Sequence, residues 1–192
     1  MKVVAFNCSP RKDGNTSHMI KEILRILESE GIETEFVQVG GNDLHGCRAC
    51  GACGKSKNMK CIYNDDIVNE CISKMVAADG IIIGSPTYFA DLTTEAKALI
   101  DRAGYVIRAN GMLTNRKVGA AVSAVRRAGS IHTLDSITHF FTINGMYVVG
   151  SSYWGMSLSR MEGDFENDKE GVKTVQDLGS NMAWILKKIN GE

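Results

Sequence analysis

Short apolar runs alternate with longer amphipathic segments along the chain, and this alternation constrains the fold more than any other feature of the sequence. The runs that predict strands are 2–7, 33–39, 80–84, 118–123 and 146–150. Five segments predict helices. The first is capped by Asn15 or Thr16, the second is opened by Asp65-Asp66, and the third is capped by Thr93 and Thr94 and expected to end at about Gly104. The last two begin at Ile131 and at Gly171. Strands that alternate with helices form a parallel sheet with helices on both faces, joined by right-handed crossovers. We therefore predict an α/β fold built on a doubly wound, five-stranded parallel sheet.

Length and charge are typical of a single-domain protein that acts on small molecules. The 192 residues fall within the usual size of one domain, and no linker or repeat divides them, so 1–192 is expected to form one domain. The 22 basic residues balance 22 acidic ones, which gives no electrostatic footprint for nucleic acid or for a membrane surface. The first residues lack the apolar stretch of a signal peptide, and no window is apolar enough to span a bilayer, so we expect a cytoplasmic, reducing location.

The segment after the first predicted strand, residues 9–17 (SPRKDGNTS), leads directly into a predicted helix. Ligands of doubly wound sheets bind beyond the carboxyl ends of the strands, and a helix N-terminus attracts phosphate through its free N–H groups and its dipole. The hydroxyl and amide side chains suit an oxyanion, and Arg11 can add two parallel donors. Because the dinucleotide pattern G-x-G-x-x-G and the P-loop pattern are both absent, a monophosphate fits this segment best. The alternative is an ordinary turn followed by a capped helix.

Four of the six cysteines fall within fifteen residues, in the pattern C-x2-C-x2-C-x7-C. They are Cys47, Cys50, Cys53 and Cys61. In a reducing compartment such crowding indicates metal or redox chemistry rather than disulfides. The pattern matches the compact runs of ferredoxins better than the separated pairs typical of structural zinc. A [4Fe-4S] cluster, a zinc ion and a loop of free thiols all remain open.

Other side chains with potential chemistry are given plainer roles. Cys8 and Cys71 are predicted to be packing residues, since free cysteine is often buried. His45, beside the cysteine loop, is the one histidine that merits mutation, with simple solvent exposure as its alternative. Three acidic residues are predicted to be solvated loop charges: Asp164, Glu166 and Asp168.

Five motifs carry a resemblance to a known family. They are residues 9–17, GSPTYF at 84–89, Asp101-Arg102, the stretch Arg126–Ser130, and GSSYWG at 150–155. In this order they resemble the flavodoxin-like NAD(P)H-dependent FMN reductases, and the resemblance spans nearly the whole chain. It implies a flavodoxin-like sheet in the order 2-1-3-4-5, FMN as cofactor, and a homodimer or higher homo-oligomer that helps frame the flavin.

The resemblance also implies a set of flavin-binding residues. Those expected to hold the FMN phosphate are Ser9, Arg11, Asn15, Thr16 and Ser17. Those expected to lie against the isoalloxazine ring and the ribityl chain are Pro86, Thr87, Tyr88 and Phe89. Arg126 or Arg127 could reach the flavin pyrimidine oxygens or a nicotinamide dinucleotide phosphate, with a solvated loop as the alternative. Tyr153 and Trp154 could cover the ring or fill a subunit interface.

The cysteine pattern resembles that of the iron–sulfur flavoproteins, in which a cluster-binding loop follows the second strand of this fold. The loop at about 40–65 keeps all four cysteines, with the last gap at the long end of that pattern. Relatives in the broader reductase family have a similar loop without a cluster, so the metal ligands are expected from the resemblance and are not settled by it.

These observations predict an FMN-dependent oxidoreductase. It would pass electrons between a reduced donor (NAD(P)H or ferredoxin) and a small acceptor through FMN and a [4Fe-4S] cluster. No side chain need act as acid or base, because the cofactor supplies the reaction, so no catalytic residue is named. One alternative is a cluster-free NAD(P)H:FMN or quinone reductase. A second is a flavin electron carrier without turnover of its own.

Overall fold

Two strands at the centre of the sheet, β1 (Lys2–Asn7) and β3 (Gly80–Gly84), explain why helices cover both of its faces. The computed structural model describes residues 1–191. Successive side chains of a strand point to opposite faces. In β1, Val3 and Ala5 therefore pack into one core, while Val4 and Phe6 pack into the other. A strand that is apolar on both faces must be covered on both.

The remaining elements follow the predicted alternation. The other strands are β2 (Glu33–Gln38), β4 (Val118–Val125), β5 (Tyr147–Val148) and β6 (Met156–Leu158). The helices are α1 (Asn15–Ser29), α2 (Ala52–Ser56), α3 (Val68–Ala77), α4 (Thr94–Ala109), α5 (Ser130–Ile143) and α6 (Lys169–Asn190), with a short 3₁₀ helix at Phe165–Asn167. Among the described residues, no helix is both long and apolar enough to cross a bilayer.

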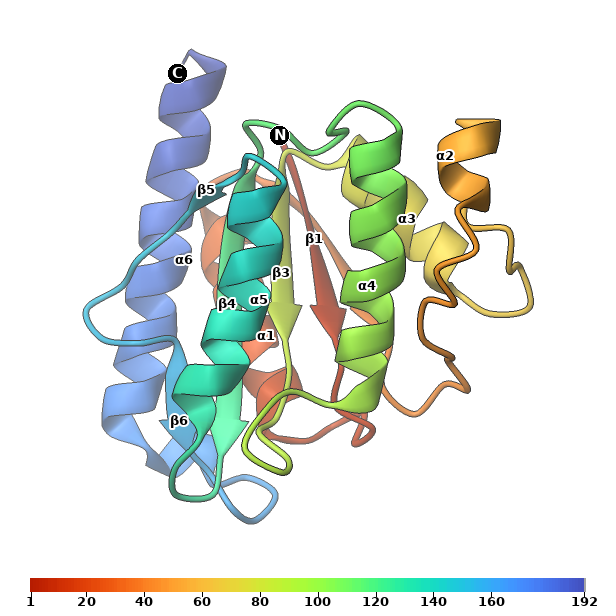
Figure 1. The fold of residues 1–192 in the computed structure, drawn as a ribbon. Coiled ribbons are helices and arrows are strands. Elements are labelled where there is room, and N and C mark those ends of the chain that lie inside the picture. The colour runs from red at the N-terminus through yellow and green to blue at the C-terminus, as the bar shows by residue number, and fades with distance from the viewer. Residues whose placement is uncertain (192) are drawn as a thin grey trace.

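The sheet is parallel and runs in the order β2-β1-β3-β4-β5, which confirms the predicted topology. Helices α1 and α6 pack on one face, and α3, α4 and α5 on the other (Figure 1). The register pairs Asn7 with Gln38 on one side and with Gly84 on the other. The carboxyl ends of the three strands are therefore level, and the loops that follow them meet at one edge.

Several bounds differ from those that the sequence predicts. β5 has only two residues, and after it the chain returns to pair β6 with the end of β4. The sequence did not predict β6, because a strand of three residues is too short to show a period-2 alternation of apolar side chains. α4 runs past Gly104 to Ala109, since burial of its later residues Val106 and Ile107 outweighs the cost of about 1 kcal/mol for a helical glycine. The five-residue α2, inside the cysteine loop, was also not predicted.

Candidate functional site

The loop between β1 and α1 is held by a side chain from the end of β2 and by one from the N-cap of α4. The Gln38 side chain donates to the Ser9 carbonyl (2.8 Å), and the Thr93 hydroxyl donates to the Cys8 carbonyl (2.9 Å). Gly40 lies directly against the loop, because a Cβ atom there would sit 2.2 Å from the Ser9 carbonyl carbon. The backbone of this loop is thus fixed from several directions before any ligand binds.

The first turn of α1 is uncapped and buried. The N-cap is Gly14, with no side-chain hydrogen bond, so the prediction of a cap at Asn15 or Thr16 is wrong: both lie within the first turn. Ser17 is fully buried, and its hydroxyl has no hydrogen-bond partner among residues 1–191. A buried hydroxyl without a partner is unfavourable. Together with the free N–H groups of a helix start, it forms a site that an oxyanion would complete.

Two of the predicted phosphate ligands, Asn15 and Arg11, lie in different surroundings. The amide group of Asn15 donates to the Met161 carbonyl (2.7 Å) and accepts from the Phe165 N–H (3.2 Å). Asn15 therefore ties the segment after β6 to the start of α1. Arg11 is exposed, so its guanidinium can reach a ligand at this edge, and its backbone N–H donates to the Ser9 hydroxyl (3.2 Å).

The loop after β3 presents two aromatic side chains to solvent. Tyr88 is 53% exposed and Phe89 is fully exposed. Partial burial raises the pKa of Tyr88, and the charge of Glu95 adds to this, while nearby Arg11 opposes it. An exposed apolar surface beside an oxyanion site suits a flat aromatic ring that carries a phosphate.

Deeper in this loop the side chains are fixed. The Thr87 hydroxyl bonds to the hydroxyls of Ser123 and Thr133 (3.0 Å each), which joins the ends of β3, β4 and α5. Pro86 is half-buried beside it. The bonds of Thr87 hold the backbone just before Tyr88 and Phe89.

The remaining predicted flavin contacts are peripheral. Arg126 and Arg127 are both exposed after β4. The rings of Tyr153 and Trp154 contact one another at 4.9 Å between centroids and line a cavity of about 370 Å³ beside α5. They are about half exposed, so a ligand or a second chain could still cover them.

Two of the acidic side chains predicted to be solvated are structural. Asp168 caps α6 by accepting from the Gly171 N–H (3.0 Å), and it also accepts from the Ser157 hydroxyl (2.9 Å). Asp164 accepts from two backbone N–H groups of the preceding turn, and these bonds lower its pKa. Glu166 is exposed and pairs with His18. The prediction of solvated charges was therefore wrong for Asp164 and Asp168, because turn and cap bonds are not visible in composition.

The cysteine loop brings its four cysteines to one cavity of about 190 Å³. The cysteines that line it are Cys47, Cys50, Cys53 and Cys61. The loop reaches this shape through left-handed backbone at Ala49 (φ 51°) and Gly51 (φ 69°), just before α2. Cys8 and Cys71 lie elsewhere, fully buried in the core, as predicted. Burial raises the pKa of the Cys71 thiol to about 12.

A buried arginine forms one wall of the same cavity. Arg102 of α4 is 1% exposed, and its guanidinium donates to the carbonyls of Tyr63 (3.0 Å) and His45 (3.4 Å). It also pairs with the carboxylate of Asp66. Burial alone lowers the pKa of Arg102, but Asp66 and Cys61 outweigh it and raise the value. Sequence reasoning gave Arg102 no role, although a charge on the otherwise apolar face of α4 was a signal.

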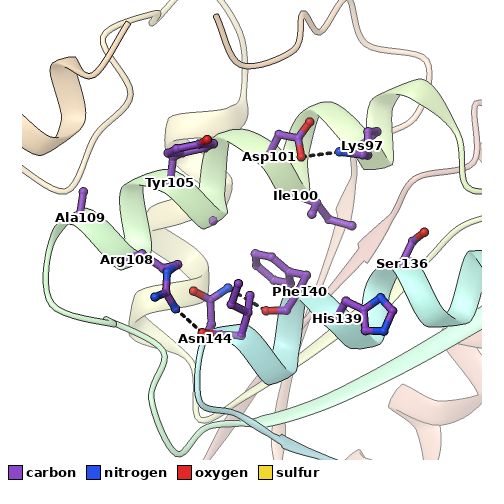
Figure 2. Close-up of a pocket in the computed structure, with 12 residues that line it drawn as sticks. Lys97, Ile100, Asp101, Tyr105, Arg108, Ala109, Ser136, His139, Phe140 and Asn144 are labelled. Carbon is purple, nitrogen blue, oxygen red and sulfur yellow. Dashed lines mark hydrogen bonds and ion pairs between the residues drawn. The ribbon is translucent and has the colours of Figure 1, made fainter. Parts of the chain in front are cut away.

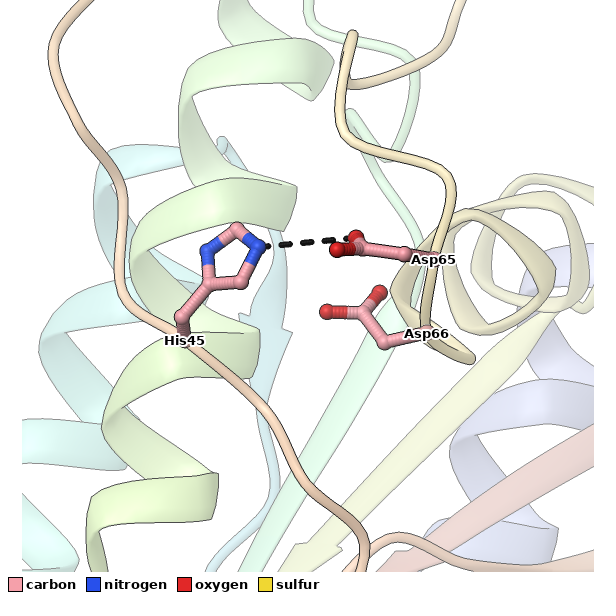
Figure 3. A group of neighbouring side chains, drawn as sticks. All are labelled: His45, Asp65 and Asp66. Atoms are coloured by element: carbon pink, nitrogen blue, oxygen red, sulfur yellow. Dashed lines mark ion pairs between the residues drawn. The ribbon is translucent and has the colours of Figure 1, made fainter.

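His45 does not line this cavity but lies beside Asp65 and Asp66 (Figure 3). Its ring packs edge-on against Tyr63, and its Nε2 lies 3.5 Å from an Asp65 carboxylate oxygen. Ligand atoms of His45, Asp65 and Asp66 are close together, but the Asp66 carboxylate is already paired with Arg102. We therefore assign no metal to this group.

A larger groove of about 830 Å³ separates α4 from α5 (Figure 2). Phe140 and Ile100 form its apolar floor, and the exposed Tyr105 lines both this groove and the cysteine cavity. The sequence did not predict the groove, since it arises from two helices that are far apart along the chain.

The two candidate sites occupy opposite ends of α4. Thr93, just before this helix, contacts the loop after β1, whereas Arg102 and Tyr105 line the cysteine cavity. From Thr94 to Tyr105 the helix rises about 16 Å. Figure 1 shows α2 beside the far end of α4, where Gly54 approaches Ala109.

Comparisons with known proteins agree with this geometry. A family model described as NADPH-dependent FMN reductase matches residues 1–160. An iron-sulfur flavoprotein of Methanocaldococcus jannaschii is 39% identical over 98% of this chain and 99% of its own length. An iron-sulfur flavoprotein of Methanosarcina thermophila is 35% identical over 98% of this chain and 97% of its own.

Solved structures share the fold at low identity. RosB with a bound intermediate superposes with a TM-score of 0.78 at 17% identity, over 99% of this chain and 80% of that one. A WrbA-like flavodoxin from Agrobacterium tumefaciens gives 0.67 at 16% identity, over 97% of both chains. These likenesses show a flavodoxin-like fold.

Proposed function

This chain belongs to the family of NADPH-dependent FMN reductases and is an FMN-dependent oxidoreductase. We propose that it passes electrons between a reduced donor and a small acceptor through FMN and a [4Fe-4S] cluster. The observation that carries the proposal is the convergence of all four loop cysteines on one cavity. Four thiolates in a compact loop are the ligand set of such clusters. Zinc accepts the same ligands, so the metal must be identified directly.

The flavin phosphate would be held at the start of α1. The groups proposed to bind it are the hydroxyls of Ser9, Thr16 and Ser17, the free N–H groups of the first turn and the Arg11 guanidinium. The unpartnered Ser17 hydroxyl supports this assignment. Asn15 would act mainly by holding the neighbouring segment in place, since its amide is bonded to that segment.

The flavin ring would lie against the loop after β3. Tyr88 and Phe89 offer it an apolar face, and Pro86 and Thr87 fix the backbone beneath them. Arg126 is proposed to reach the edge of the flavin from the loop after β4. When bound, FMN exchanges a hydride or single electrons, and the cluster exchanges single electrons. The protein residues orient these groups, and none of them is proposed to transfer a proton.

The donor is proposed to be NAD(P)H or an acidic one-electron carrier such as ferredoxin. The loop around the cysteines supports the second, because it is basic. Its exposed cations are Arg48, Lys55, Lys57 and Lys60, and no acidic residue lies between Cys47 and Cys61. Opposite charges steer a carrier to such a surface. A thiolate-bound cluster also suits a reducing compartment, which supports a cytoplasmic location.

The protein is further proposed to be a homodimer or a higher homo-oligomer. The groove between α4 and α5, with exposed Tyr105 and Ile143 at its rim, supports this. Sedimentation velocity at micromolar concentration tests it, and a monomer throughout would contradict it.

Anaerobic purification, followed by iron, sulfide and flavin analysis, tests the cofactor content. We expect one FMN, four iron and four sulfide per chain. Flavin without iron would favour the cluster-free reductase, and zinc in place of iron would make the loop structural. Oxidation of NADPH with a quinone or free FMN as acceptor then separates an enzyme from a carrier, since a carrier turns over no donor.

A further inference from the structure

We infer that Arg102 is a positioning residue that sets the reduction potential of the cluster held by the four loop cysteines. This inference rests on the proposed function. It concerns a side chain that is not a ligand and that the sequence motif for the cluster does not include.

The bonds of Arg102 place its charge against the cysteine cavity. Two carbonyls, those of His45 and Tyr63, accept from its terminal nitrogens, and these residues flank the cysteine segment on either side. Asp66 binds one of the same nitrogens. The guanidinium therefore joins both ends of the loop to α4, with its side chain completely buried.

One donor of this group remains free. The Nε–H of Arg102 is buried and has no partner in the described part of the chain. Arg102 and Cys61 line the same cavity. A buried donor without a partner is unfavourable, and a thiolate or cluster sulfur in that cavity would supply the acceptor. Hydrogen bonds to the sulfurs and nearby charge are two of the main determinants of cluster potentials.

The direction of the effect follows from charge. One-electron reduction by a donor adds one negative charge to the cavity. A buried cation stabilises that charge strongly because little water screens it. Arg102 should therefore favour the reduced form and raise the potential, while the paired carboxylate of Asp66 moderates the effect.

Substitutions at these two positions should shift the potential in opposite directions. Arg102→Gln removes the cation and should disfavour reduction about tenfold, which is about 59 mV for one electron. Asp66→Asn removes the balancing anion but can keep the bond that Asp66 accepts from the Val68 N–H, and it should favour reduction. Arg102→Lys keeps the charge, and its shift should be well below tenfold. Lys97→Gln, on an exposed turn of α4 outside the cysteine cavity, is the control and should leave the potential unchanged.

The measurement is an anaerobic dye titration of the cluster-loaded protein, followed by EPR, with iron and FMN content determined in parallel. Opposite shifts in Arg102→Gln and Asp66→Asn would support the inference, because loop disruption alone would lower iron content in both without opposite shifts. Potentials equal to that of the wild type in both would overturn it. If Arg102→Gln does not hold iron, the Asp66→Asn variant alone tests the inference. A shift of its potential toward easier reduction supports the inference, and an unchanged potential overturns it. A wild-type protein that takes up no cluster would overturn the proposed function first, and the inference with it.

Discussion

The loop after β1 and the cysteine loop after β2 lie at opposite ends of α4 and are built in opposite ways. Bonds from Gln38 and Thr93 hold the first loop, and it leads into a buried helix start. The second loop is largely exposed and contains only the five-residue α2. Of the six non-glycine residues with positive φ within 1–191, three lie in it: Ala49, Lys57 and Met59.

The difference shows two ways to build a cofactor site. In the first loop, the sheet fixes the hydrogen-bond donors, because the carboxyl ends of β1, β2 and β3 are aligned. A ligand therefore enters a site that already exists. In the cysteine loop, left-handed backbone shapes the segment, and bonds from the Arg102 and Asn69 side chains hold the residues at its edges. We expect the first site to be tolerant of ligand loss and the second to depend on its metal.

Loss of one cysteine should separate the two sites most sharply. Cys50→Ser should abolish the cluster, since a hydroxyl is a poor substitute for a thiolate ligand, and should leave one FMN per chain. Iron, sulfide and flavin analysis after anaerobic purification measures both. The control, Cys71→Ala, removes a buried thiol and should keep the iron. Retention of four iron in Cys50→Ser would show that Cys50 is not a ligand.

Removal of two phosphate donors should act on the first site alone. Arg11→Ala combined with Thr16→Ala should raise the Kd for FMN at least about 100-fold, or about 2.7 kcal/mol, because each charged hydrogen bond contributes about 1.5–3 kcal/mol. Fluorescence titration of the flavin-free protein measures the Kd, and iron content should not change. An unchanged Kd would remove the phosphate assignment from this loop.

A methyl group added at matched glycines should distinguish a fixed loop from an open one. Gly40→Ala places a Cβ atom against the Ser9 carbonyl, so the backbone must shift, at a cost of about 1–3 kcal/mol in the free energy of unfolding. Gly46→Ala meets no atom within 4 Å and should change stability by less than about 0.5 kcal/mol. Urea unfolding measures both. Equal effects would mean that the first loop is not held as tightly as its contacts indicate.

The free energy of unfolding should depend on alkaline pH in a way that identifies Cys71 as a core residue. The folded state raises the pKa of Cys71, by burial, to about 12, so the unfolded chain loses this proton first. The stabilisation is present below pH of about 9 and is lost as pH rises toward 12, by up to about 1.4 kcal/mol per pH unit. Cys71→Ala should remove this part of the slope in urea unfolding between pH 7.5 and 10.5. Met75→Leu, on the same buried face, should keep the slope, and an identical slope in all three proteins would contradict the assignment.

The sequence determined the fold because its signals are local. Alternating periods predicted the strands and helices, and the resemblance of the loops implied their order in the sheet. Thr93 was predicted as a helix cap and does accept from the Ala96 N–H. The spacing of the four cysteines also predicted them as one group, since residues within a fifteen-residue segment can meet in a single loop.

Only the tertiary structure decided what surrounds these groups. Asn15 bonds to Met161 and Phe165, which are 146 and 150 residues away, and no local pattern encodes such a contact. Arg102 became buried against the cysteine loop because two segments 36 to 57 residues away fold over it. Periodicity says which face of a helix is apolar, but the partner of a charge on that face depends on packing between distant segments. For this reason the sequence located both candidate sites, and the folded chain alone showed what holds each of them.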